Sequence, residues 1–95
     1  MKTEYDVSPG KYHVAVTSQD IACGVRGDGS ACAVTLALKR ALDIDSAEVT
    51  DRHIRVGALC GDGPEAINAF IQAYDDNRDV EPFEFDLELD PLEDY

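Results

Sequence analysis

The alternation of apolar and polar residues near the two ends of the chain predicts two β-strands. The segment YHVAVT at residues 12–17 and the segment FEFDLELD at residues 83–90 both repeat with a period of two. That period is typical of a strand with one buried and one exposed face. Pro82 and Pro91 flank the second segment, where a residue without an amide hydrogen fits the start or end of a strand. We therefore expect the carboxylates at its even positions to point away from the core.

Apolar residues that recur three and four positions apart predict two helices, at about 30–42 and 64–76. Asp28 or Ser30 would cap the first helix, and Pro64 suits the first position of the second. A further helical turn at 18–23 would be capped by Ser18. The apolar positions are Val34, Leu38, Ala41, Leu42, Ile67, Phe70, Ile71 and Tyr74.

Two short strands are predicted between the helices, at about 47–50 and 53–58. Val49 is apolar at an odd position, whereas Ile54 and Val56 are apolar at even positions. One uninterrupted strand cannot place all three on one face, so a hairpin turn is expected near Asp51.

The predicted order, strand–helix–strand–strand–helix–strand, indicates one α+β domain over residues 1–95. We expect a four-stranded antiparallel sheet with two helices on one face, and a ferredoxin-like arrangement of two split halves is compatible with this order. Residues 1–10 would form a loose leader, and residues 91–95 an acidic tail. The predicted core is Val14, Val16, Val34, Leu38, Leu42, Ile54, Val56, Ile67, Phe70, Ile71, Phe83, Phe85 and Leu87.

The charge of the chain is strongly uneven. The net charge is −12, yet residues 1–60 contribute only −1 of it and residues 61–95 contribute −11. An acidic surface repels nucleic acid and anionic membranes and attracts basic proteins. Solubility, or adaptation to a salty cytoplasm, are alternative causes of the acidity. The candidate partner-binding residues are Asp75, Asp76, Asp79, Glu81, Glu84, Asp86, Glu88, Asp90, Glu93 and Asp94.

The acidic strand at residues 83–90 suggests mimicry of a polyanion. Carboxylates at alternate positions lie about 6.6–6.8 Å apart along a strand. Phosphates of duplex DNA follow one another at about 3.4 Å per strand, so the row would match every second phosphate. The alternative is the solvated outer face of a sheet, whose charges also prevent aggregation.

The sequence gives little support to catalysis, and we predict no enzyme, catalytic residue, metal or cofactor. The chain has no Trp to form a sugar-binding platform beside paired carboxylates, and its acids lack the spacing of a calcium loop. Cys23, Cys32 and Cys60 are odd in number and form no CxxC pair, so small partly buried thiols are expected rather than disulfides. A zinc site with a histidine and pairing of Cys23 with Cys32 are the alternatives. The polar N-terminus leads us to expect the cytoplasm of a host cell.

The glycine-rich segment Gly24–Ser30 leads into a predicted helix, where free amides can bind anions. It lacks the Lys-Ser/Thr of a P-loop and reverses the dinucleotide-binding glycine pattern. A structural loop is therefore expected, and use of the loop by a small-molecule sponge or an enzyme is the alternative.

Four segments carry a resemblance to a group of small uncharacterised proteins of tailed phages and prophages. They are DIA at residues 20–22, GDGSACAVTLAL at 27–38, AFI at 69–71 and VEPFEFDL at 80–87. In that group the helix often opens with Cys-Pro after Gly-Asp-Cys, whereas here Gly29 and Ala33 replace the first cysteine and the proline.

Small acidic phage proteins resemble, as a class, anti-CRISPR and anti-restriction inhibitors, many of which mimic DNA. The resemblance implies a non-enzymatic inhibitor that covers a basic nucleic-acid-binding surface of a host defence complex. An accessory protein that binds another basic protein, such as a transcription factor, is the alternative.

Overall fold

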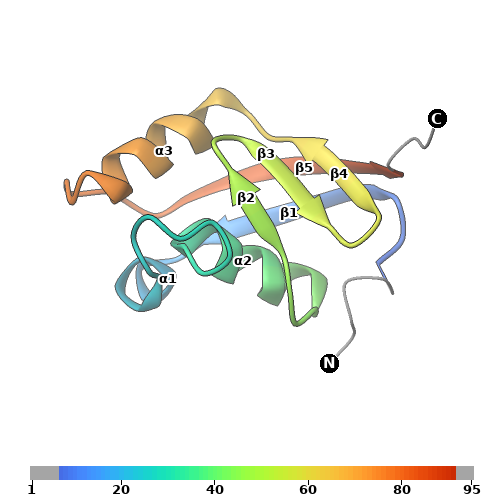
Figure 1. The fold of residues 1–95 in the computed structure, drawn as a ribbon, viewed down its shortest axis with the longest axis horizontal. Helices are drawn as coiled ribbons and strands as arrows, with labels where there is room; N and C mark the ends of the chain where they lie inside the picture. The colour runs from blue at the N-terminus through green and yellow to red at the C-terminus, as the bar shows by residue number, and fades with distance from the viewer. Residues whose placement is uncertain (1–6, 92–95) are drawn as a thin grey trace.

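The chain folds into one α+β domain with a five-stranded antiparallel sheet and three helices (Figure 1). A computed structural model describes residues 7–91, so most of the predicted leader and the tail residues Glu93 and Asp94 lie outside the described residues. The elements in chain order are β1 (Gly10–Val16), α1 (Ser18–Cys23), α2 (Ala33–Leu42), β2 (Glu48–Thr50), β3 (His53–Val56), β4 (Leu59–Asp62), α3 (Glu65–Asp75) and β5 (Phe83–Pro91).

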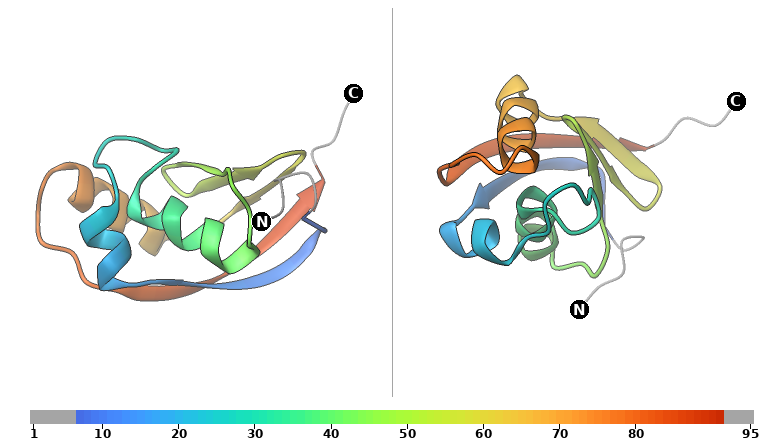
Figure 2. Two further views of the ribbon diagram at one scale, coloured as in Figure 1. Left: turned by 90° about the horizontal axis from the view of Figure 1, so that it is seen from below. Right: turned by 60° about the vertical axis from the view of Figure 1, so that its left-hand side comes forward.

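The sheet has the strand order β1-β5-β4-β3-β2 and consists of two parts. Strands β1 and β5 pair along their length, from Gly10 opposite Leu89 to Val16 opposite Phe83. Strand β4 meets β5 only at its end, where Cys60 lies opposite Asp90. A long β1/β5 ribbon and a β2–β3–β4 meander are therefore joined at one corner (Figure 2).

The prediction of four strands and two helices is wrong by one of each. Residues 59–62 form β4, although Cys60 and Gly61 break any apolar alternation there. Residues 18–23 form the helix α1, which is capped by Thr17 rather than by Ser18. The ferredoxin-like arrangement is also not adopted. In a ferredoxin-like sheet, a single strand would lie between β1 and β2. Here β1 and β2 lie at opposite edges of the sheet, with β5, β4 and β3 between them.

The three helices and the meander all lie on one side of the β1/β5 ribbon, whereas two helices were predicted on one face of a single four-stranded sheet (Figure 2). Eleven of the thirteen predicted core residues are buried, and Ile71 and Phe83 are partly buried and pack against that core. The core also takes in Tyr74 and Leu89, which are fully buried. The inner face of the ribbon is thus covered, while its outer face is left to solvent.

Helix α2 begins three residues later than predicted. Its N-cap is Cys32, whose side chain contacts the Thr35 hydroxyl at 3.3 Å but makes no capping hydrogen bond to a backbone amide of the helix. Asp28 accepts hydrogen bonds from the backbone nitrogen and hydroxyl of Ser30, at 2.9 and 2.7 Å, so it closes a turn of the loop instead. The predicted cap by Asp28 or Ser30 is therefore wrong, because this turn separates both residues from the helix.

The chain covers part of each free edge of the sheet. At the β2 edge, Val49 donates a backbone hydrogen bond to the Gly29 carbonyl at 2.9 Å. A β-carbon on Gly29 would lie 2.4 Å from the Val49 carbonyl oxygen, so this close approach requires glycine. At the β1 edge, Arg40 donates to the Ala15 carbonyl at 2.8 Å. Capped edges of this kind oppose edge-to-edge aggregation.

A candidate protein-binding surface on the outer face of the ribbon

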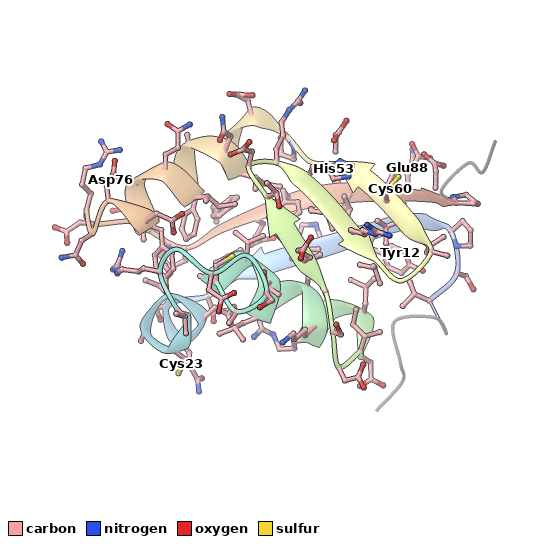
Figure 3. The ribbon with its side chains drawn as sticks, in the orientation of Figure 1. Tyr12, Cys23, His53, Cys60, Asp76 and Glu88 are labelled. Carbon is pink, nitrogen blue, oxygen red and sulfur yellow. The ribbon has the colours of Figure 1, made fainter. Side chains whose placement is uncertain are left out.

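The acidic residues that are adjacent in sequence separate into distinct groups in space. One group lies at the end of α3 and in the segment after it, and a second lies on β5. Asp76 and Glu88 mark the two groups and lie toward opposite ends of the molecule (Figure 3). The structure therefore does not gather the predicted binding residues into one surface. The first group is Asp75, Asp76, Asp79 and Glu81, and the second is Glu84, Asp86, Glu88 and Asp90.

The outer face of the ribbon displays the β5 carboxylates as a row. Along β5, Phe85 and Leu87 are buried and the intervening acids are exposed. The side chain of Glu84 is 66% exposed and that of Asp86 is 84% exposed. The prediction that these acids point away from the core is confirmed.

Strand β1 adds positive charge to the same outer face. His13 lies between two acids, with its Nδ1 2.8 Å from Asp86 Oδ1 and its Nε2 2.6 Å from Glu84 Oε1. Lys11 lies opposite Glu88 in the strand register. The cations of β1 thus lie beside the row of carboxylates. Replacing the acids would remove the hydrogen-bond partners of His13 rather than relieve repulsion between like charges.

The contacts of His13 favour its protonated form. An ionised carboxylate only accepts hydrogen bonds, so both ring nitrogens must carry hydrogen for both contacts to form. Hydrogen bonds to Asp86 and to Glu84 accordingly raise the pKa of His13 above its ordinary value. The two contacts therefore favour the cationic imidazolium form of His13 on this face.

Two acids at the end of α3 have a role within the fold. Asp75 accepts a hydrogen bond from the Gly27 backbone nitrogen at 2.7 Å, and Asp76 lies 3.3 Å from Arg78. Arg26 stacks over the Tyr74 ring at 4.2 Å and donates to the Tyr74 carbonyl oxygen. The contacts of Asp75 and Arg26 hold the glycine loop against the end of α3, so Asp75 in this acidic group is committed to structure.

The glycine loop offers no evident cradle for an anion. Its amides at Val25, Gly27 and Ser30 donate to acceptors of the chain itself. A cavity of about 220 Å³ beside the loop is lined by three carboxylates, Asp28, Asp51 and Asp75. Hydrogen bonds from Ser30 lower the pKa of Asp28, which keeps that carboxylate ionised. A phosphate group would be repelled from this cavity.

Sequence reasoning missed a buried ion pair near the first strand. Asp20 is 4% exposed, and its two carboxylate oxygens each accept a 2.7 Å hydrogen bond from Arg40. Burial by itself would raise the pKa of Asp20, but the hydrogen bonds from Arg40 and Thr17 outweigh it and lower the pKa. Asp20 also completes a capping box with Thr17, and the Thr-x-x-Asp spacing was the one available signal.

The Cys and His side chains that could have bound a metal do not form a common site in the described residues. Cys23 is exposed, Cys32 is buried and Cys60 is partly buried, and all three are free thiols. His53 lies on β3, 3.0 Å from Asp62, and strands β5 and β4 separate it from the strand of His13. Within residues 7–91, no group of three or more His, Cys, Asp or Glu side chains is arranged to hold a metal ion. No helix in this described part of the chain is long and apolar enough to cross a membrane.

Comparison of the chain with known protein families, with curated proteins and with solved structures found no match.

Proposed function

We propose that this protein is a non-enzymatic binding protein that covers a basic nucleic-acid-binding surface of a host defence complex. The observation that carries the proposal is the outer face of the β1/β5 ribbon. It displays Glu84, Asp86 and Glu88 at alternate positions, and no element of the described chain covers it. The resemblance to small phage proteins supports a defence complex as the target.

The ribbon is suited to present charge rigidly. Strands β1 and β5 pair over seven consecutive residues, and the opposite face of the ribbon packs on the core. The backbone positions that carry the carboxylates therefore keep a fixed spacing of about 6.6–6.8 Å, and binding requires no ordering of the backbone. A net charge of −12 would in addition speed the approach of a basic partner at low salt.

The same surface would also fit another basic protein, such as a transcription factor. DNA would compete with the protein for either partner, so parallel assays of phage interference and of transcription separate the two. The glycine-loop sponge receives less support, because the amides of Val25, Gly27 and Ser30 already have acceptors within the chain and the cavity is lined by carboxylates.

The test is a neutral triple variant, Glu84→Gln with Asp86→Asn and Glu88→Gln. It removes the charge of three of the four acids on β5 and keeps the shape of each side chain, and these exposed positions are expected to contribute little to stability. We expect it to lose protection of an invading phage in cells that carry restriction or CRISPR interference. Plaque counts measure the effect, and urea unfolding checks the fold.

The matched control is Asp45→Asn with Glu48→Gln and Glu65→Gln, three exposed acids remote from the ribbon face. It changes the net charge by the same amount, so it is expected to retain activity. A folded ribbon variant with full activity would refute the proposed surface. Loss of activity in both variants would show that only overall acidity matters.

A further inference from the structure

The ribbon face contains its own cation at the point where a partner would bind. His13 contacts Glu84 and Asp86 through its two ring nitrogens, at 2.6 and 2.8 Å. Two of the four carboxylates on β5 are therefore already in contact with a side chain of the same chain.

Six charged or titratable side chains of the described residues share this face. Strand β1 contributes Lys11 and His13, and β5 contributes Glu84, Asp86, Glu88 and Asp90. With a protonated His13 their net charge is −2, and it becomes −3 when His13 loses its proton. Loss of one proton thus makes the face more negative by one charge.

A basic partner must compete with His13 for the same oxygen atoms. An arginine guanidinium binds a carboxylate best through two parallel hydrogen bonds, which requires free oxygens on that carboxylate. An open hollow of about 480 Å³ beside His13 and Asp86, also lined by Lys11 and Glu88, gives an incoming side chain access to the site.

Displacement of His13 would change its proton affinity. Its bonds to Asp86 and Glu84 hold the pKa of His13 above the ordinary value of 6.5. An imidazole pushed away from both carboxylates and placed beside an arginine loses this support, and at neutral pH its proton passes to the solvent.

We infer that His13 is an internal competitor, which couples the binding of an arginine-bearing partner at the ribbon face to the release of one proton. This inference rests on the proposed function, since it names the regulation of the same surface. Affinity should rise with pH, by at most about tenfold per pH unit for one linked proton.

The first experiment needs no partner. Nuclear magnetic resonance of the His13 ring nitrogens, followed from pH 5 to 9, is expected to show an imidazolium that titrates above the ordinary histidine range. The Glu84→Gln, Asp86→Asn double variant should return the titration to that range. A His13 titration that is the same in both proteins would overturn the inference.

The second experiment titrates the protein with an oligo-arginine peptide between pH 6 and 8.5, and follows the amide signals of β5. Arginine keeps its charge over this range. We expect several-fold tighter binding at the higher pH, and calorimetry in two buffers of different ionisation enthalpy should report release of a proton. His13→Gln should bind tightly at pH 6 without this pH dependence, whereas His13→Arg should bind weakly throughout.

The matched control is His53→Gln, which removes the other described imidazole and should keep the wild-type pH dependence. Binding at the β5 row with equal affinity at all pH values would overturn the inference and leave the proposed function standing. If the peptide changes only protein amide signals at the end of α3, the proposed surface is overturned, whatever the His13 titration shows.

Discussion

Two clusters that combine acidic and basic side chains lie near β1, and they differ in burial. The Asp20–Arg40 pair encloses a buried carboxylate, and Arg40 also binds the Ala15 carbonyl of β1. The His13–Glu84–Asp86 cluster lies on the outer face of the same strand, where all three side chains are more than half exposed. The hydrogen bonds of the two clusters are similar in length.

The difference shows that burial, rather than hydrogen-bond geometry, decides what such a cluster does. A buried carboxylate without its partner remains desolvated, so removing the partner is costly. An exposed cluster exchanges its contacts for water at almost no cost. Asp20–Arg40 therefore stabilises the fold, whereas the His13 cluster can open and accept a different cation.

The largest expected effect comes from breaking the buried pair. Arg40→Ala leaves Asp20 without its main partner and should reduce the free energy of unfolding by about 3 kcal/mol. Urea unfolding at pH 7 measures the loss. The control Arg55→Ala removes an exposed arginine of β3 and should cost much less. Equal losses in the two variants would contradict the contrast between buried and exposed pairs.

A smaller effect is expected from pH, and its direction differs between the clusters. The pKa of Asp20 is lowered in the folded state, so its stabilisation is present above the ordinary value of 3.8 and is lost as pH falls through the folded pKa. The pKa of His13 is raised, so its contribution is complete below 6.5 and is lost as pH rises through the folded pKa.

Thermal melts across pH test these two directions separately. Asp20→Asn should flatten the acid side of the stability profile, and His13→Gln should flatten the region above pH 6.5. A His13→Gln profile that differs from the wild type only below pH 4 would show that the two assignments are wrong.

The smallest effect is expected from neutralising the exposed cluster alone. The Glu84→Gln, Asp86→Asn variant should lose in urea unfolding only the small pH-dependent contribution of His13, because exposed ion pairs contribute little. A clear loss of stability in this variant would mean that the ribbon depends on its outer face. The surface could then not exchange His13 for a partner without weakening the fold.

Strong periodicity made the main elements predictable from the sequence. The alternation at residues 83–90 predicted β5, and the spacing of Ile67, Phe70, Ile71 and Tyr74 predicted α3. Strand β4 gave no such signal, because Cys60 and Gly61 disrupt its pattern. Its place in the sheet comes from pairing with β3 and β5.

The sequence by itself determined which side chains of β5 face solvent, since a period of two separates acids from apolar residues along one strand. Only the tertiary structure decided which residues would neighbour those acids. His13 is more than seventy residues away from Glu84 and Asp86, and the β1/β5 register brings them together. The same applies to Asp20 and Arg40, whose contact depends on how α1 packs against α2. Local periodicity specifies the faces of an element, whereas contacts between elements depend on the register and packing of the whole chain.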